Sequence, residues 1–291
     1  MPSTREIRRR IRSVKNTSQI TKAMQMVAAS RMRRAQEAVE ASRPFSEKIR
    51  EVLAHIGNAS PTGEGPMHPL LERREVQRIA LGMITSDRGL AGAFNANLIR
   101  RSSTFILDDA NAPVRIISVG RKGRDYMIRY GRDVVADYSE LGDRPQLDAI
   151  TPVARTVTDS FIEGDIDEVW LAYTEYVNTL TQTAQLVKLL PIEPPSQEEL
   201  DEAERGPDYI FEPDPRQLLQ ALLPRYVEVQ LYQALLESKA SEHAARMVAM
   251  RNATDNANEI AQDLTLTYNK IRQATITREI IEVSSGAAAL G

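Results

Sequence analysis

The sequence predicts a long α-helical coiled coil joined to an α/β fold, in which antiparallel N- and C-terminal helices flank a small Rossmann-like α/β domain. Residues 225–285 contain neither proline nor glycine, so nothing in the composition interrupts a C-terminal helix there. Residues 2–57 carry a second long helical pattern. Between the two, short β-branched runs alternate with helical runs, an order that is typical of an α/β sheet.

The C-terminal helix is predicted for residues 216–291. At about 1.5 Å per residue, its uninterrupted part would be roughly 90 Å long, far more than a helix inside an ordinary core. Pro224 is expected to be either a first-turn residue or a kink after a short turn at 216–223. Small and apolar residues recur at coiled-coil spacing. They are Val227, Leu231, Ala234, Ser238, Ser241, Ala245 and Val248, followed by Ala249, Ala253, Ala257, Ile260, Leu264, Thr267 and Ile271.

The N-terminal helix, assigned to residues 1–57, has its own apolar stripe and contains Pro44, which we expect to bend or break it. Through Arg34 it holds ten basic residues and a single acid, Glu6. That face is either solvated or meets an acidic protein, a membrane surface or nucleic acid. The stripe comprises Ile7, Ile11, Val14, Ile20, Met24, Val27, Ala35, Ala38, Ser42, Phe45, Ile49, Val52 and Ile56.

The central part divides into a linker (58–75), an α/β domain (76–190) and an acidic, proline-rich connector (191–215), in which Tyr209–Phe211 could add an edge strand. Strands are predicted at Val76–Ile84, Val114–Val119, Val134–Tyr138, Glu168–Tyr176 and Thr183–Leu190. Helices are predicted at Gly92–Leu107, Arg121–Tyr130 and Thr151–Glu163. The sheet should therefore be parallel or mixed.

Few residues offer chemistry. There is no cysteine, which excludes disulfides and thiol catalysis, and His55, His68 and His243 lack metal-ligand spacing, so neither cofactor nor metal is expected. Gly89 and Gly92 do not form a phosphate-binding motif, and Asp87–Arg88 is interpreted as a turn-stabilising pair. No run approaches the ~20 apolar residues of a membrane span, and no apolar leader is present, so a cytoplasmic protein is expected.

The two long helices, if both leave the α/β domain and share a seam, must run antiparallel, and the C-terminal helix is then the longer. Its surplus is apolar at Ile276, Ile280, Ile281 and Val283, which predicts an external apolar sleeve. A polar band lies just before and among these residues. It consists of Arg272, Gln273, Thr277, Arg278 and Glu279.

Four segments together resemble the gamma subunit of F-type ATP synthase over the full length and in the right order. They are ITKAMQMVAASRMRRAQ (20–36), ITSDRGLAGAFN (84–95), ASEHAARMVAMRNATDNA (240–257) and IRQATITREIIEVSSGAAAL (271–290). The resemblance implies a non-catalytic rotor shaft that couples ion-driven rotation of the membrane c-ring to the catalytic sites for ATP synthesis or hydrolysis. It implies alpha, beta and epsilon subunits and the c-ring as partners, at the cytoplasmic face of a bacterial plasma membrane.

The resemblance also implies partner contacts for particular residues. The stretch with Arg272, Gln273, Thr277 and Glu279 would touch catch loops of the surrounding subunits. The segment with Met24, Arg31, Arg33 and Arg34 would face the lever of a catalytic subunit, and the apolar tip with Ile280 and Leu290 would turn in a hydrophobic bearing. Ala91 stands where many relatives carry cysteine.

Two other classes remain open on the residues alone. A coiled-coil scaffold or nucleic-acid-binding protein would use the basic N-terminal helix and bind with a steep salt dependence. An α/β enzyme with helical arms would bind a nucleotide at the Gly89–Gly92 turn.

Overall fold

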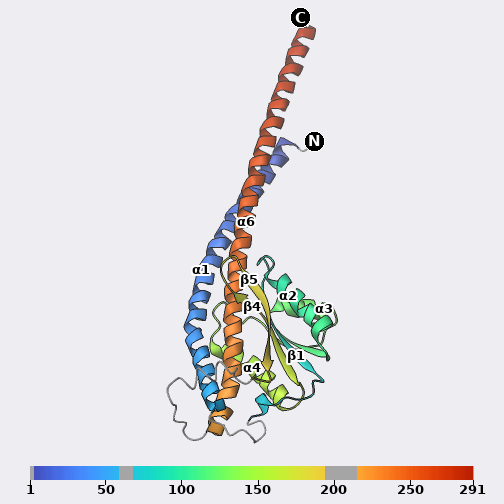
Figure 1. The fold of residues 1–291 in the computed structure, drawn as a ribbon. Coiled ribbons are helices and arrows are strands. Elements are labelled where there is room, and N and C mark those ends of the chain that lie inside the picture. The colour runs from blue at the N-terminus through green and yellow to red at the C-terminus, as the bar shows by residue number, and fades with distance from the viewer. Residues whose placement is uncertain (1–2, 59–67, 194–214, 291) are drawn as a thin grey trace. The chain divides into compact units, whose positions relative to one another are not determined.

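The computed structural model describes residues 3–58, 68–193 and 215–290, and its elements are labelled in Figure 1. Two very long helices, α1 (Thr4–Asn58) and α6 (Pro215–Leu290), enclose the sheet-forming part of the sequence. The chain divides into two compact units. Unit 1 comprises Met1–Ala28 and Arg246–Gly291, and unit 2 comprises Ala29–Ala245.

Unit 2 contains a five-stranded sheet in the order β3-β2-β1-β4-β5, and the sheet is mixed, one of the two kinds that the alternating pattern predicted. Strands β1 to β4 are parallel, and β5 pairs antiparallel with β4. The strands are β1 (Ile79–Ile84), β2 (Val114–Val119), β3 (Val134–Tyr138), β4 (Glu168–Tyr176) and β5 (Gln182–Leu190). The first strand begins three residues later than Val76, because Gln77 and Arg78 give their backbone amides to Asp167 instead of to a strand.

The sheet is buried on both faces, which explains why the strands read as short apolar runs. Helices α2 (Phe94–Thr104) and α3 (Arg121–Arg129) cover one face, where Leu98, Phe105 and Met127 pack on β1 and β2. Helix α4 (Leu147–Ile162) and the start of α6 cover the other, where Phe161 and Leu231 share one core. The beginning of α6 is thus a structural helix of the α/β domain.

The shorter elements depart slightly from their predicted bounds. The first helix of the domain begins at Phe94 and ends in a π-helical turn, η2 (Phe105–Asp109). Helix α4 begins four residues before Thr151 and includes Pro152 in its interior. A short helix, η1 (Pro69–Leu71), lies in the predicted linker, whereas Tyr209–Phe211 lies outside the described residues.

Both prolines in the long helices lie within continuous helix, so the predicted break at Pro44 and the predicted first-turn position of Pro224 were wrong, whereas a bend at either residue stays a prediction. Helix α1 is not broken at Pro44, and α6 begins nine residues before Pro224, which is therefore not a first-turn residue. Leu219, Leu223 and Val227 are buried on the same side of α6 before and after Pro224. Packing of these side chains holds the helix together through a residue that lacks a backbone N–H.

Unit 1 is a pair of helical segments from α1 and α6. Ile7, Ser18, Thr21 and Ala28 are the buried residues of α1 here, and Met250, Thr254, Ala257 and Ala261 are those of α6. The predicted stripe of α1 was wrong in its middle part, since Ile20 and Val27 are 61% and 51% exposed. Small polar side chains occupy the seam instead, so the heptad continues from Val14 through Ser18 and Thr21.

Candidate partner-binding site

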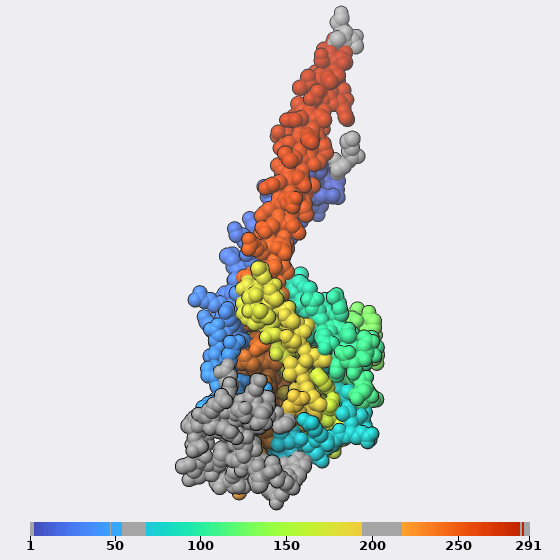
Figure 2. All heavy atoms as spheres, in the orientation of Figure 1, coloured from blue at the N-terminus to red at the C-terminus, as the bar shows by residue number. Residues whose placement is uncertain are grey.

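The C-terminal part of α6 is a helix with solvent on all sides. Each side chain described from Arg272 onward is exposed. Figures 1 and 2 show this end of α6, in red, extending past the N-terminal end of α1, in blue. Ile276, Ile280 and Val283 are 47%, 62% and 73% exposed, and their four-three spacing places them on one side of the helix. Such a stripe needs an apolar partner, because its area is otherwise left in water.

The predicted polar residues accompany this stripe. Arg272, Gln273, Thr277 and Glu279 are all exposed, and Arg272 lies 5.9 Å from the ring centroid of Tyr268. Arg8 of α1 contacts the same ring at 5.4 Å and donates a 2.5 Å hydrogen bond to the Tyr268 hydroxyl. Tyr268 thus joins α1 to α6 just before the exposed part of α6 begins. Leu290 is the final helical residue, and its side chain lies outside the described part.

Hydrogen bonds between small polar side chains join the two helices of unit 1. The hydroxyls of Thr21 and Thr254 are 2.7 Å apart, and Ser18 donates to Asn258 at 2.7 Å. Both threonines are buried, at 9% and 7% exposed. Because a shift of one residue would break these bonds, they determine the register of the helix pair. Sequence reasoning missed Ser18, Thr21, Thr254 and Asn258, although the uninterrupted heptad spacing of α1 could have indicated the first two.

The predicted N-terminal contact residues fall into different units and environments. Met24 is half-buried in unit 1. Arg31, in unit 2, forms an ion pair with Asp143 at 2.7 Å, which ties α1 to the loop between β3 and α4. Arg33 pairs with Glu37 one turn along the same helix, and Arg34 is exposed beside a cavity of about 300 Å³. The basic residues before Lys22 are exposed.

The turn after β1 places an acidic side chain at the N-terminus of α3. The Asp87 carboxylate accepts the backbone amides of Arg121, at the start of α3, and Glu140, at 3.2 and 3.1 Å. The chain's own anion thus occupies the helix N-terminus that would otherwise attract a phosphate. Gly120 has a φ of 96° and packs so closely that a Cβ there would lie 2.1 Å from the carbonyl oxygen of Thr85. The predicted turn-stabilising pair was Asp87 with Arg88. In the described contacts, Asp87 instead stabilises the turn through the backbone amides of Arg121 and Glu140.

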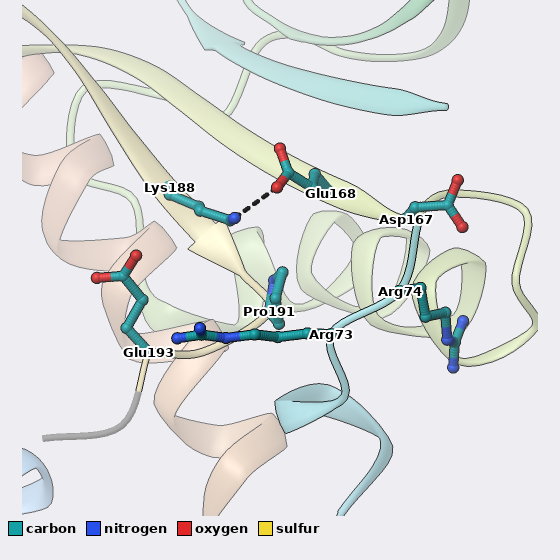
Figure 3. A pocket seen from close by; sticks show the side chains of 7 residues that line it. All are labelled: Arg73, Arg74, Asp167, Glu168, Lys188, Pro191 and Glu193. Atoms are coloured by element: carbon teal, nitrogen blue, oxygen red, sulfur yellow. Dashed lines mark hydrogen bonds and ion pairs between the residues drawn. The ribbon is translucent and has the colours of Figure 1, made fainter. Parts of the chain in front are cut away.

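A cavity of about 250 Å³ near the start of β4 carries charges of both signs (Figure 3). Lys188 bonds Glu168 at 2.5 Å, and Arg73 extends toward Glu193. Arg74 also lines the cavity, and its guanidinium bonds Glu72 and the carbonyl oxygen of Phe161. The charges balance, and no side chain is arranged as a nucleophile with an adjacent base.

His68 and His243 are both buried side chains within the fold. His68 Nδ1 accepts the amide of Leu70 at 3.1 Å, and burial lowers the pKa of His68. His243 is 1% exposed, with Nε2 3.9 Å from Asp143. Among the described residues, no group of three His, Asp or Glu could hold a metal ion. Within the same residues, no helix is long and apolar enough to span a bilayer.

An α/β domain inserted between two long paired helices, one of which ends in an exposed apolar stripe, is the fold of ATP synthase central stalks. A structure of the Tetrahymena thermophila mitochondrial ATP synthase central stalk and c-ring aligns with a TM-score of 0.60 and 26% identity, over 80% of this chain and 99% of that one. A Euglena gracilis mitochondrial ATP synthase structure shares the fold, with a TM-score of 0.68 and 21% identity over 99% of this chain and 94% of that one.

Sequence comparisons identify the family within this class of ATP synthase proteins. The family described as ATP synthase matches residues 3–290. The ATP synthase gamma chains of Roseiflexus castenholzii and Desulforamulus reducens are 53% and 52% identical, over the whole of this chain and 99% and 100% of theirs. That of Chloroflexus aurantiacus is 49% identical, again over the whole chain. This chain therefore belongs to the ATP synthase gamma chain family, as the four sequence segments indicated.

Proposed function

We propose that this chain is the rotating shaft of a bacterial ATP synthase and carries no catalytic residue itself. Rotation of the c-ring would turn α1 and α6 together and so drive the catalytic sites of the surrounding subunits through their conformations. The observation that carries the proposal is the exposed apolar stripe at Ile276, Ile280 and Val283 on an otherwise solvated helix. A stripe of this kind is stable in water only when another protein covers it.

The partners we propose are the alpha and beta subunits around the helices, and the epsilon subunit and c-ring at the α/β domain. The names of the T. thermophila and E. gracilis structures, which include a c-ring, support the last of these. The chain would then be a peripheral component at the cytoplasmic face of the plasma membrane. Exposed Arg33 and Arg34, together with the basic residues before them, would meet acidic surfaces of partners.

The mechanism rests on asymmetry. A shaft changes the conformation of a surrounding subunit only through contacts that differ between orientations. Arg272, Gln273, Thr277 and Glu279 offer directional contacts next to an apolar stripe, so each orientation presents a different surface to each neighbour. The polar bonds Thr21–Thr254 and Ser18–Asn258 would keep the two helices in register while they turn.

The absence of native cysteine permits a direct test. Ile280→Cys introduces one thiol for a photo-crosslinker, and Leu107→Cys, whose parent side chain is 65% exposed in the α/β domain, is the matched control. In the purified complex, the Ile280 probe is expected to cross-link to the alpha or beta subunit and to block ATP hydrolysis. The control probe is expected to leave hydrolysis intact. An Ile280 probe that reacts only with water, in a complex with full activity, contradicts the proposal.

A further inference from the structure

Strand β4 has a free edge where β1 ends. The last pair between them in the described sheet is Met83 with Ala172, whereas β4 continues to Tyr176. Beyond Ala172 the side of β4 that faced β1 has no strand beside it, so its backbone groups need other partners.

Two serines of α6 supply those partners at Thr174. The Thr174 amide donates to Ser238 Oγ at 3.1 Å, and Ser241 Oγ donates to the Thr174 carbonyl oxygen at 3.1 Å. Thr174, Ser238 and Ser241 are 3%, 2% and 0% exposed. Residues three apart share a helix face, so the pair grips both backbone groups of a single strand residue. We call Ser238 and Ser241 the serine clamp.

The clamp differs in kind from the other contacts between α6 and the sheet. Leu223, Val227 and Leu231 contribute apolar contacts, which are non-directional and tolerate small rotations. A slip of α6 by one residue moves it about 1.5 Å along its axis and about 100° around it, which would break both clamp bonds. Tyr232 adds a further directional bond, to the carbonyl oxygen of Pro145 at 3.1 Å.

We propose that the serine clamp is the element that prevents α6 from rotating or sliding against the α/β domain, and so transmits torque between them. This inference rests on the proposed rotor function, because it assumes that torque enters through the domain. Ser238 and Ser241 are positioning residues that contact neither substrate nor a catalytic subunit.

The test uses the whole complex with Ser238→Ala, Ser241→Ala and the double variant. Two controls are available. Ser102→Ala removes a buried hydroxyl of α2 that has no hydrogen-bond partner among the described residues. Thr174→Val removes the side-chain hydroxyl of Thr174, which likewise has none there, and leaves its backbone in the clamp.

Hydrogen exchange measures the contact itself. Ser238→Ala removes the acceptor of the Thr174 amide and should speed its exchange about five- to tenfold. Ser241→Ala removes only the donor to the carbonyl and should change this amide less. Both controls should leave it protected. A Thr174 amide that already exchanges freely in the unmodified complex overturns the clamp, whatever the function of the chain.

The coupling between the ion gradient and ATP synthesis tests whether the serine clamp transmits torque. In vesicles, the ratio of gradient-driven ATP synthesis to unloaded ATP hydrolysis should fall severalfold in the double variant, with hydrolysis unchanged. Ser102→Ala and Thr174→Val should keep the ratio of the unmodified complex. A normal ratio alongside fast Thr174 exchange overturns the role in torque and leaves the rotor function intact. If the double variant does not assemble, the same ratio is measured in Ser238→Ala and in Ser241→Ala and compared with that of the unmodified complex. A chain that does not co-purify with an ATPase refutes the rotor function, and with it the role in torque.

Discussion

Glu237 is an acidic residue placed where its charge is unfavourable. One carboxylate oxygen accepts from Gln233 at 3.1 Å, and the other is buried with no hydrogen-bond partner among the described residues. Burial raises the pKa of Glu237, Glu175 raises it further, and Gln233 and Arg43 oppose the rise. Burial and the same two acids raise the pKa of Tyr173 to about 12. These groups lie between α6 and β4, next to the serine clamp.

Glu237→Gln is expected to stabilise the protein at neutral pH by about 1 kcal/mol, because it removes a partly buried charge. The folded-state pKa of Glu237 lies above its ordinary value of 4.5. The folded state therefore binds the proton more tightly, and the stability from this group is present below pH 4.5 and is lost as pH rises through the folded pKa. Thermal unfolding across pH should show the advantage of the variant vanish in acid.

Glu259→Gln, on an exposed part of α6, is the matched control and should change stability little at any pH. An advantage of Glu237→Gln that persists below pH 4.5 would show that loss of the charge is not its cause.

The Thr21–Thr254 bond can be tested with a double-mutant cycle. Thr21→Val and Thr254→Val each remove one hydroxyl from a buried pair and should each cost about 1 kcal/mol. The combination should cost less than the sum, because no polar partner is then left behind. Helix melting by far-ultraviolet circular dichroism measures all three. Thr265→Val is the control, since its hydroxyl bonds Ala261 of its own helix. Additive losses would mean that the two hydroxyls do not interact.

At the same scale, the predicted stripe of α1 was wrong where small polar residues, Ser18 and Thr21, form the buried side of the helix. The predicted stripe included Ile20 and Val27 and left out Ser18 and Thr21, because periodicity arguments weigh hydrophobicity. The helices pack closely through small side chains and cross-helix hydrogen bonds instead, and Ile20 and Val27 remain exposed. In α6 the prediction was confirmed at Val227, Leu231 and Ala234, which are buried. It was wrong at Ile260, which is 50% exposed, and at Thr267, which is also exposed.

At the scale of the elements, each of the two long helices contains a proline that removes one backbone hydrogen bond and so lowers the stability of the helix. Pro224 cannot bond the carbonyl of Gln220, which is exposed, as is Glu40 four residues before Pro44. Pro224→Ala should restore a backbone bond and stabilise α6 by about 1–3 kcal/mol, and Pro44→Ala should act similarly on α1. Thermal unfolding measures both. A loss of stability in either variant would mean that the proline ring makes packing contacts worth more than the missing bond.

The junction of β1, β2 and α3 depends on a glycine. Gly120→Ala should destabilise unit 2 severely, because its Cβ would lie 2.1 Å from the Thr85 carbonyl oxygen in a backbone with a φ of 96°. Gly131→Ala is the matched control. Its φ is 66°, but a Cβ there would meet nothing within 4 Å, so only about 1–2 kcal/mol of backbone strain is expected. Equal losses in the two variants by chemical denaturation would contradict this account.

Element types proved easier to predict than their ends. The five strands follow from β-branched runs, and all are present. The start of β1 depends on Asp167, a residue far away in sequence that captures the amides of Gln77 and Arg78. The start of α4 was predicted at Thr151, four residues late, and Pro152 lies inside the helix. The error at β1 thus comes from a tertiary contact that no local pattern contains.

For the molecule as a whole, the Asp87 carboxylate at the N-terminus of α3 has a direct consequence for nucleotide binding. ATP, with or without magnesium, is expected not to raise the melting temperature of the chain, since a ligand that binds only the folded state would raise it. A differential scanning measurement at increasing nucleotide concentration checks this. A concentration-dependent rise would revive the enzyme hypothesis, and abolition of that rise by Asp87→Ala would locate the site at this turn.

The partner-binding residues of the shaft were predicted from family resemblance, and their roles remain predictions. What the residues alone could indicate was the exposed apolar stripe, because Ile276, Ile280 and Val283 break the rule that solvated helices are polar. The contacts of Arg31 with Asp143 and of Tyr268 with Arg8 join positions far apart in sequence, and no spacing rule predicts them.

Helix α6 follows every strand in the sequence and also forms a wall of the α/β domain. Leu219, Leu223, Val227 and Leu231 seal the sheet face that α4 covers only in part. On the ribosome, that face must wait uncovered until residues beyond Leu235 have emerged, although every strand was made earlier. A prematurely terminated chain is therefore expected to expose an unfinished core, the kind of surface that chaperones and proteases recognise.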